Sequence, residues 1–284
     1  MTPSRNCGVS IADINHAGGR FGFLLIHRLG GVPADVGYVA DGLARAGYSV
    51  LCPLLYGHGG SRALLAATTW RQWYESVGEA HTALAERCDT IVVGGLGVGA
   101  LLALELAVER RERVDGLALF APTFWPNGWA MPWYGNALRL VGSKRLADFI
   151  RFDERPPFGI KDDALRAEML ASQARDGRPM EDILGRSGGA LLEVKWLAGH
   201  VKPRLRLVKQ PSLIFHPRHD DRSALSASQG LQRRLGGAVD LIVLDDSYHL
   251  VTSDRQRALV LERVLEFAEA LPELASCGAP EHAD

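Results

Sequence analysis

The chain has 284 residues, of which 47% are hydrophobic and 23% charged, a composition typical of a soluble globular protein. Its 32 basic and 33 acidic residues give a formal net charge of −1. This balance excludes a global attraction to nucleic acid or an anionic membrane and leaves only a local basic patch open. The sequence contains no apolar run of about 18 residues, so it predicts no membrane-spanning helix. The N-terminus does not resemble a signal peptide, so we expect a cytoplasmic protein.

The four cysteines are too far apart, and too irregularly spaced, to indicate a zinc site or a disulfide framework. They are Cys7, Cys52, Cys88 and Cys277. We expect neither a metal nor a cofactor.

Apolar runs of strand length alternate with helical patterns along most of the chain. The expected strands are 20–27, 48–55, 90–96, 114–121, 211–216 and 239–244. The expected helices are 33–46, a helix capped by Thr69 and Gln72, 100–109, and a last helix through 260–271. Continuous apolar strands that alternate with helices predict an α/β fold with a mostly parallel sheet covered on both faces.

This alternation stops between Pro122 and Arg204, where we expect no strand and two helices, near 162–175 and 181–199. The prediction is one α/β domain with a helical insertion. Its parts are an N-terminal extension (1–19), a core (20–122 and 207–272), a helical cap (123–206) and a disordered tail (273–284).

The glycine-rich turn at 95–99 lies between an expected strand and an expected helix and has three interpretations. Gly95, Gly97 and Ala100 fit the dinucleotide-binding pattern GxGxxA, which would need Asp115 as its acidic partner. The same turn fits a nucleophile elbow, G-x-S-x-G, with flanks Gly95 and Gly99 and with Gly97 at the apex. We favour the elbow; the third interpretation is a plain glycine turn.

Several motifs together carry a resemblance to a known family. They are LLIHRLGGVPAD at 24–35, GHGGS at 57–61, GGLGVGALLALELA at 94–107, APTFW at 121–125, HPRHDD at 216–221 and SYHLVTSDRQR at 247–257. With them the chain resembles α/β-hydrolases of the branch that holds bacterial carboxylesterases, monoacylglycerol lipases and serine aminopeptidase-like hydrolases. The resemblance implies the α/β-hydrolase fold with a helical cap.

The resemblance also implies roles for individual residues. The catalytic histidine falls on His249 and its acid on Asp220, with Asp221 a weaker candidate for the acid. The order elbow, acid, histidine is that of the family. The two backbone N–H groups of the oxyanion hole fall on Leu29 and Val98.

Two positions depart from the family pattern. Gly97 stands where the family has its nucleophilic serine, which argues against acyl-enzyme chemistry. Arg28 stands where the family has a glycine after its first histidine. It is either a solvated side chain or an anchor for a substrate anion. Cys52 is a weak candidate for a substitute nucleophile.

The aromatic residues of the insertion have two interpretations. Trp125, Trp129 and Trp133 either pack the cap or form an apolar wall over the ligand, for which we name Trp125 and Trp129 as substrate-binding candidates. His58 is expected to be a structural loop residue.

Three functional hypotheses follow. In the favoured one, His249 and Asp220 perform general-base chemistry with an oxyanion hole on a small apolar acyl or ring substrate, without an acyl-enzyme. The reaction could be hydrolysis, C–C cleavage, elimination or cyclisation. In the second, a pseudo-hydrolase binds a small ligand or a protein partner. In the third, the chain is an inactive serine-to-glycine variant of a carboxylesterase. None of them involves nucleic acid, and the oligomeric state does not follow from the sequence.

Overall fold

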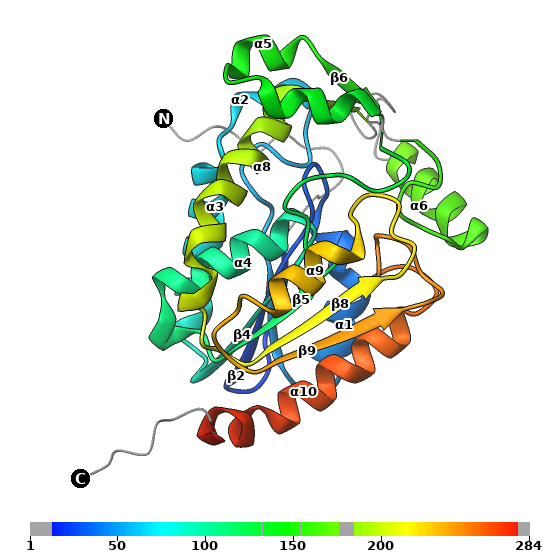
Figure 1. Cartoon of the computed structure of the whole chain (residues 1–284). Helices are drawn as coiled ribbons and strands as arrows, with labels where there is room; N and C mark the ends of the chain where they lie inside the picture. Colours follow the sequence, from blue (N-terminus) through cyan, green and yellow to red (C-terminus); the bar gives the residue numbers. More distant parts are fainter. Residues whose placement is uncertain (1–12, 132, 154, 176–184, 278–284) are drawn as a thin grey trace, which may run out of the picture.

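The computed structural model describes residues 13–131, 133–153, 155–175 and 185–277. Its centre is a seven-stranded sheet with the order β1-β3-β2-β4-β5-β8-β9 (Figure 1). In that order the strands are β1 (Ile14–His16), β3 (Ser49–Cys52), β2 (Phe21–Ile26), β4 (Thr90–Leu96), β5 (Gly116–Phe120), β8 (Ser212–Pro217) and β9 (Val239–Leu244). Every neighbouring pair is parallel except β1 and β3. The predicted α/β fold with a mostly parallel sheet is confirmed.

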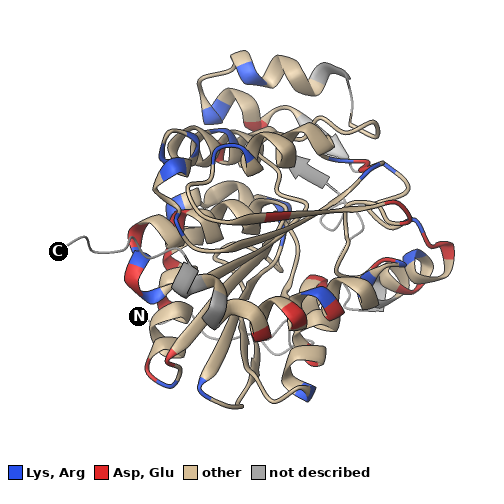
Figure 2. Cartoon of the chain, turned by 60° about the horizontal axis from the view of Figure 1, so that its bottom comes forward, with Lys and Arg blue, Asp and Glu red and all other residues tan. Residues whose placement is uncertain are grey.

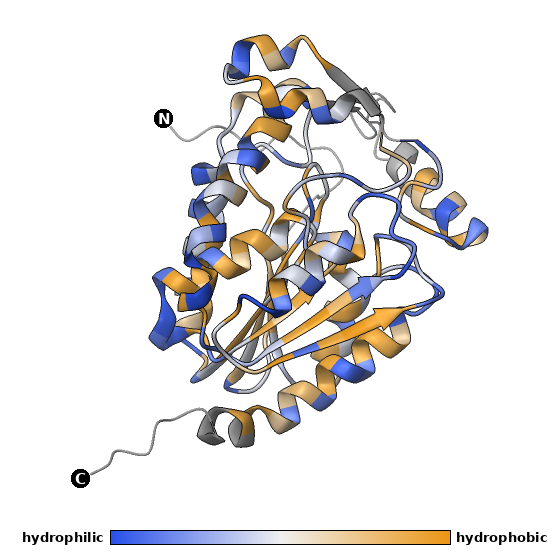
Figure 3. Ribbon diagram, viewed as in Figure 1, coloured by the Kyte–Doolittle hydropathy of each residue, from blue (hydrophilic) through white to orange (hydrophobic). Residues whose placement is uncertain are grey.

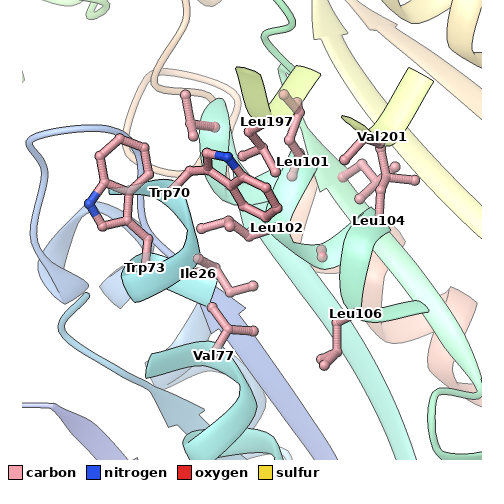
Figure 4. Close-up of a cluster of buried hydrophobic side chains, with 14 of the residues drawn as sticks. Ile26, Trp70, Trp73, Val77, Leu101, Leu102, Leu104, Leu106, Leu197 and Val201 are labelled. Atoms are coloured by element: carbon pink, nitrogen blue, oxygen red, sulfur yellow. The ribbon is translucent and has the colours of Figure 1, made fainter. Parts of the chain in front are cut away.

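Two separate apolar clusters cover the two faces of the sheet. Along β2, Phe23 and Leu25 belong to one cluster and Leu24 and Ile26 to the other, because successive strand side chains point to opposite faces. The first cluster includes α1 (Gly37–Arg45) and α10 (Arg257–Cys277); the second includes α3 (Trp70–Ala85) and α4 (Val98–Glu109). Figure 4 shows part of the second cluster. The strands are apolar in Figure 3, and most charges lie on helices and loops in Figure 2.

The start of α3 follows the predicted capping box. The Thr69 hydroxyl accepts a hydrogen bond from the Gln72 N–H, and the Gln72 Oε1 accepts one from the Thr69 N–H at 2.9 Å. These contacts satisfy two backbone donors that the first turn of a helix leaves without partners. The remaining helices outside the insertion are η1 (Pro33–Val36), α2 (Arg62–Ala67), η2 (Arg111–Arg113) and α9 (Leu225–Gln232).

The insertion between β5 and β8 is mainly helical. Its elements are η3 (Trp133–Leu140), α5 (Lys144–Asp148), β6 (Arg151–Asp153), α6 (Asp163–Arg175), β7 (Gly185–Ser187), α8 (Gly188–Val201) and η4 (Lys202–Leu207). Helix α8 packs against α3 and α4, and α5 packs against α8. The expectation of no strand here was wrong, because β6 and β7 form a short antiparallel pair. Periodicity cannot detect strands of three residues.

The two ends of the described chain also differ from expectation. Strand β1 lies within the predicted N-terminal extension and pairs with β3 at the sheet edge. Helix α10 continues through Cys277, into the segment predicted as a disordered tail, whose last residues, 278–284, lie outside the described part. Within the described residues, no helix has the length and apolar character needed to cross a membrane.

Candidate functional site

The turn at 95–99 connects β4 to α4 through a backbone conformation that favours glycine. Gly97 has φ +60° and ψ −110°, and its N–H donates to the Phe120 carbonyl at 2.8 Å. A Cβ on Gly95 would lie 2.2 Å from the Gly99 carbonyl carbon, and one on Gly99 would lie 2.4 Å from the Ile26 carbonyl oxygen. Glycine is therefore required at both flanks for the helix to pack this close to the strands.

The dinucleotide interpretation of this turn was wrong. Asp115, the acidic residue it would need, accepts a hydrogen bond from the Ile91 N–H at 2.7 Å. Ile91 is near the start of β4, and the turn follows the other end of that strand. The Asp115 carboxylate therefore lies at the amino end of β4, whereas the turn follows its carboxyl end, so the carboxylate cannot contact a ligand held at the turn.

His249 and Asp220 lie in the loops after β9 and β8 and contact each other directly. The His249 Nδ1 is 2.9 Å from Oδ2 and 3.1 Å from Oδ1 of Asp220, and both side chains are buried. Since a carboxylate only accepts, the Nδ1–H donates, which makes Nε2 the basic nitrogen of the ring. The backbone N–H groups of Arg222 and Ser223 also donate to Asp220, at 2.7 and 3.0 Å.

These contacts keep Asp220 ionised although it is buried. Burial alone would raise the pKa of its carboxyl, but the charge of His249, the hydrogen bond from His249 and the nearby His216 together hold the pKa below its usual range. The His216 Nε2 lies 3.5 Å from Asp220 Oδ2 and donates to the Ser223 carbonyl at 2.9 Å. Burial lowers the pKa of His216. Asp220 is therefore an ionised acceptor that orients His249.

Asp221, the weaker candidate for the acid, contacts backbone instead of the imidazole. Its Oδ1 accepts from the His249 N–H at 3.2 Å, and its Oδ2 accepts from the Gly159 N–H at 2.9 Å. Asp254, which the sequence reasoning missed, accepts from the N–H groups of Lys161 and Tyr248 at 2.8 and 2.7 Å. Two buried carboxylates thus tie the insertion to the loop that carries His249.

The basic nitrogen of His249 faces the turn after β4. A Cβ on Gly97 would lie 3.1 Å from the His249 Nε2 and 3.8 Å from its Cε1. The loops after β4, β8 and β9 meet there because parallel strands present their carboxyl ends at one edge of the sheet. The three residues that the sequence predicts for one site, Gly97, Asp220 and His249, are brought together.

Leu29 and Val98 supply two backbone N–H groups beside this position. Val98 is the first residue of α4, so its N–H has no acceptor within the helix. The close packing of Gly99 on the Ile26 and His27 carbonyls holds the loop after β2 against the start of α4. Among the described residues, neither the Leu29 nor the Val98 N–H has an acceptor. Their role as oxyanion-hole donors stays a prediction.

Arg28 borders the site and is not a solvated side chain. It is 6% exposed, its Nε lies 3.3 Å from Asp35 Oδ2, and its Cβ lies 3.7 Å from the Cβ position of Gly97. Asp35 also accepts from the Val32 N–H at 3.3 Å. The pair fixes the loop that carries Leu29. The role of Arg28 as an anchor for a substrate anion stays a prediction.

Two other candidates have structural surroundings. His58 donates from Nδ1 to the Tyr56 carbonyl at 3.1 Å, and its ring packs edge-on against Trp73. Cys52 is a buried free thiol whose pKa is raised by burial, which argues against a substitute nucleophile. In the described part of the chain, no group of three or more His, Cys, Asp or Glu side chains could hold a metal ion.

The tryptophans of the insertion have different surroundings. Trp125 is buried, with the Arg139 guanidinium 5.0 Å from its ring centre. Trp129 is 60% exposed and donates from Nε1 to the His219 carbonyl at 3.2 Å. The side chain of Trp133 lies outside the described part. A substrate-binding role for Trp125 and Trp129 stays a prediction.

Comparison with known proteins identifies the family. Residues 22–256 match the family described as serine aminopeptidase, S33. A thermostable monoacylglycerol lipase from a Bacillus species is 30% identical over 256 residues, which are 88% of this chain and 90% of that protein. A carboxylesterase from Bacillus subtilis is 23% identical over 89% of this chain and 94% of its own. The chain therefore belongs to the serine aminopeptidase S33 family.

Solved structures share the fold of this chain. A structure reported with two metagenome-derived lipolytic enzymes superposes with a TM-score of 0.76 at 26% identity, covering 93% of this chain and 99% of the other. A soluble variant of monoglyceride lipase from Saccharomyces cerevisiae, in complex with a substrate analog, gives a TM-score of 0.72 at 18% identity, over 92% and 90% of the two chains. The α/β-hydrolase fold is thus confirmed.

Proposed function

We propose that the chain is an enzyme that uses His249 and Asp220 as a general base, without an acyl-enzyme, on a small apolar acyl or ring substrate. Gly97 occupies the position of the family's nucleophilic serine, so no hydroxyl is available to attack a carbonyl. The observation that carries the proposal is the orientation of His249. Its Nδ1–H is held by Asp220, and its basic Nε2 lies 3.1 Å from the position of a Cβ at residue 97.

In hydrolysis, the His249 Nε2 would take a proton from a water molecule as the water oxygen attacks the substrate carbonyl. The carbonyl oxygen becomes an oxyanion that accepts hydrogen bonds from the Leu29 and Val98 N–H groups. Collapse of the tetrahedral intermediate breaks the bond to the leaving group, which takes the proton from His249. Asp220 stabilises the imidazolium between these two transfers. Abstraction of a substrate proton by the same nitrogen would support elimination or cyclisation.

The relatives support an acyl substrate, since those with 30% and 26% identity are named as a lipase and as lipolytic enzymes. The insertion, as a cap over the carboxyl edge of the sheet, would supply the apolar side of the binding site. The alternative is a pseudo-hydrolase that binds a ligand without catalysing a reaction.

The test is turnover of a panel of aryl and glyceryl esters by the wild-type protein and by His249→Gln and Asp220→Asn. We expect His249→Gln to abolish turnover and Asp220→Asn to lower kcat by about 10⁴-fold, the loss seen when a serine protease loses its orienting acid. Exposed His219→Gln is the control and should keep full activity. Turnover unchanged in both site variants would refute the general-base role. Binding of an ester without turnover by any form would favour the pseudo-hydrolase.

A further inference from the structure

Three cations gather where the insertion meets the core, apart from the residues of the proposed general-base site. They are Arg139 at the end of η3, Lys202 at the start of η4 and Arg234 just after α9, and both arginines lie close enough to Lys202 for their charges to act on it. All three are exposed, and among the described residues none forms an ion pair with a carboxylate. The whole chain has a net charge of −1, yet residues 123–206 contain 14 Lys and Arg against 10 Asp and Glu. The local excess of positive charge thus lies in the insertion.

Two aromatic rings hold these cations together. The Arg139 guanidinium lies 5.0 Å from the ring centre of Trp125, and the Lys202 Nζ lies 5.4 Å from that of Phe124. Phe124 and Trp125 are consecutive and buried, so the two contacts place Arg139 and Lys202 beside neighbouring rings. Cation–π contacts stabilise each charge, but they do not offset the repulsion between neighbouring cations.

Two further observations favour a negatively charged ligand with hydrogen-bond acceptors near these cations. Trp125 is 7% exposed, and its indole N–H is buried without an acceptor among the described residues. A buried donor without an acceptor is rare and destabilising. Although Lys202 is exposed, partial burial of its side chain, together with the nearby charges of Arg139 and Arg234, lowers its pKa, so its positive charge is disfavoured at this position. A group with several acceptor oxygens and a negative charge would accept from the indole N–H of Trp125 and neutralise the cations.

We propose that Arg139, Lys202 and Arg234, with the Nε1–H of Trp125, bind a phosphate group at the junction of the insertion and the core. Phosphate suits the site because its oxygens accept from the planar fork of an arginine and from a lysine ammonium at the same time. The group belongs either to a small soluble phosphate or to a phospholipid head. The site includes Trp125, a substrate-binding candidate, but neither His249 nor Asp220, so the inference does not depend on the general base.

The test titrates inorganic phosphate and glycerol 3-phosphate into the full chain at constant ionic strength and follows binding by calorimetry. We expect saturable binding that weakens about 10-fold or more in Arg139→Gln and in Lys202→Gln, the usual effect of losing a charged hydrogen bond. Arg206→Gln removes the same charge from η4, contacts neither ring and should bind as the wild type does. Phosphate should raise the Tm of the wild type and of Arg206→Gln only.

Vesicles distinguish the two sources. Binding to vesicles that contain phosphatidic acid, with no binding of the soluble phosphates, assigns the site to a lipid head; binding of the soluble phosphates assigns it to a small metabolite. In either case Lys202→Gln must weaken the interaction. The proposal is overturned if the wild type binds neither phosphate nor the vesicles, or if Arg139→Gln and Lys202→Gln bind as tightly as Arg206→Gln.

Discussion

Replacing Gly97 by serine tests the geometry of the turn and the position of His249 in one variant. A non-glycine residue at φ +60° and ψ −110° is strained by about 1–3 kcal/mol. The new Cβ would lie 3.1 Å from the His249 Nε2, so the ring must move by a few tenths of an ångström. At about 2–4 °C per kcal/mol we expect the Tm to fall by roughly 2–12 °C.

Gly97→Ala is the matched control, because it adds the same strain and the same Cβ without a hydroxyl. We expect both variants to unfold at similar urea concentrations. Only Gly97→Ser should hydrolyse short aryl esters through an acyl-enzyme and react with a serine-directed fluorophosphonate, since His249 can take the proton of the new hydroxyl. If both variants are as stable as the wild type, residue 97 is not strained. If Gly97→Ser is strained but does not react, His249 is not positioned to act on residue 97.

Three more predictions concern the surroundings of the site. Burial lowers the pKa values of His27 and His216, so these rings stay neutral in the folded chain while they become protonated in the unfolded chain below about pH 6.5. The free energy of unfolding should therefore fall as the pH falls from 7.5 to 5.5. If the urea midpoint of a His216→Gln variant keeps the full pH dependence of the wild type, His216 does not contribute to it. Asp254→Asn should lower the free energy of unfolding by about 1–3 kcal/mol, because an amide cannot accept all the N–H groups that the carboxylate holds, whereas exposed Asp240→Asn should have no effect. Arg28→Ala should lower the free energy of unfolding by about 3–5 kcal/mol, since it leaves the Asp35 carboxylate buried without Arg28. If the double variant Arg28→Ala/Asp35→Ala loses less stability than Arg28→Ala, the two side chains are energetically coupled.

The core of the fold could be predicted from the long apolar strands of the sequence. The meeting of Gly97, Asp220 and His249 could be predicted only from the family resemblance of the motifs that carry them. Particular contacts between side chains could not be predicted, because the apolar periodicity of the sequence does not determine them. The Arg28–Asp35 pair depends on how the loop after β2 folds back, and Asp221 and Asp254 act on backbone groups far along the chain. Strands β1, β6 and β7 have three residues each, too few for an apolar pattern.

The central claim is that His249 acts without a covalent intermediate, and intact-mass spectrometry of the wild-type protein during ester turnover tests it most directly. Samples quenched in acid at short times should show the unmodified mass, while Gly97→Ser treated in the same way should show the added mass of the acyl group. A wild-type adduct of acyl mass, on any residue, would contradict the account, because it would require a nucleophile that general-base chemistry at His249 does not use.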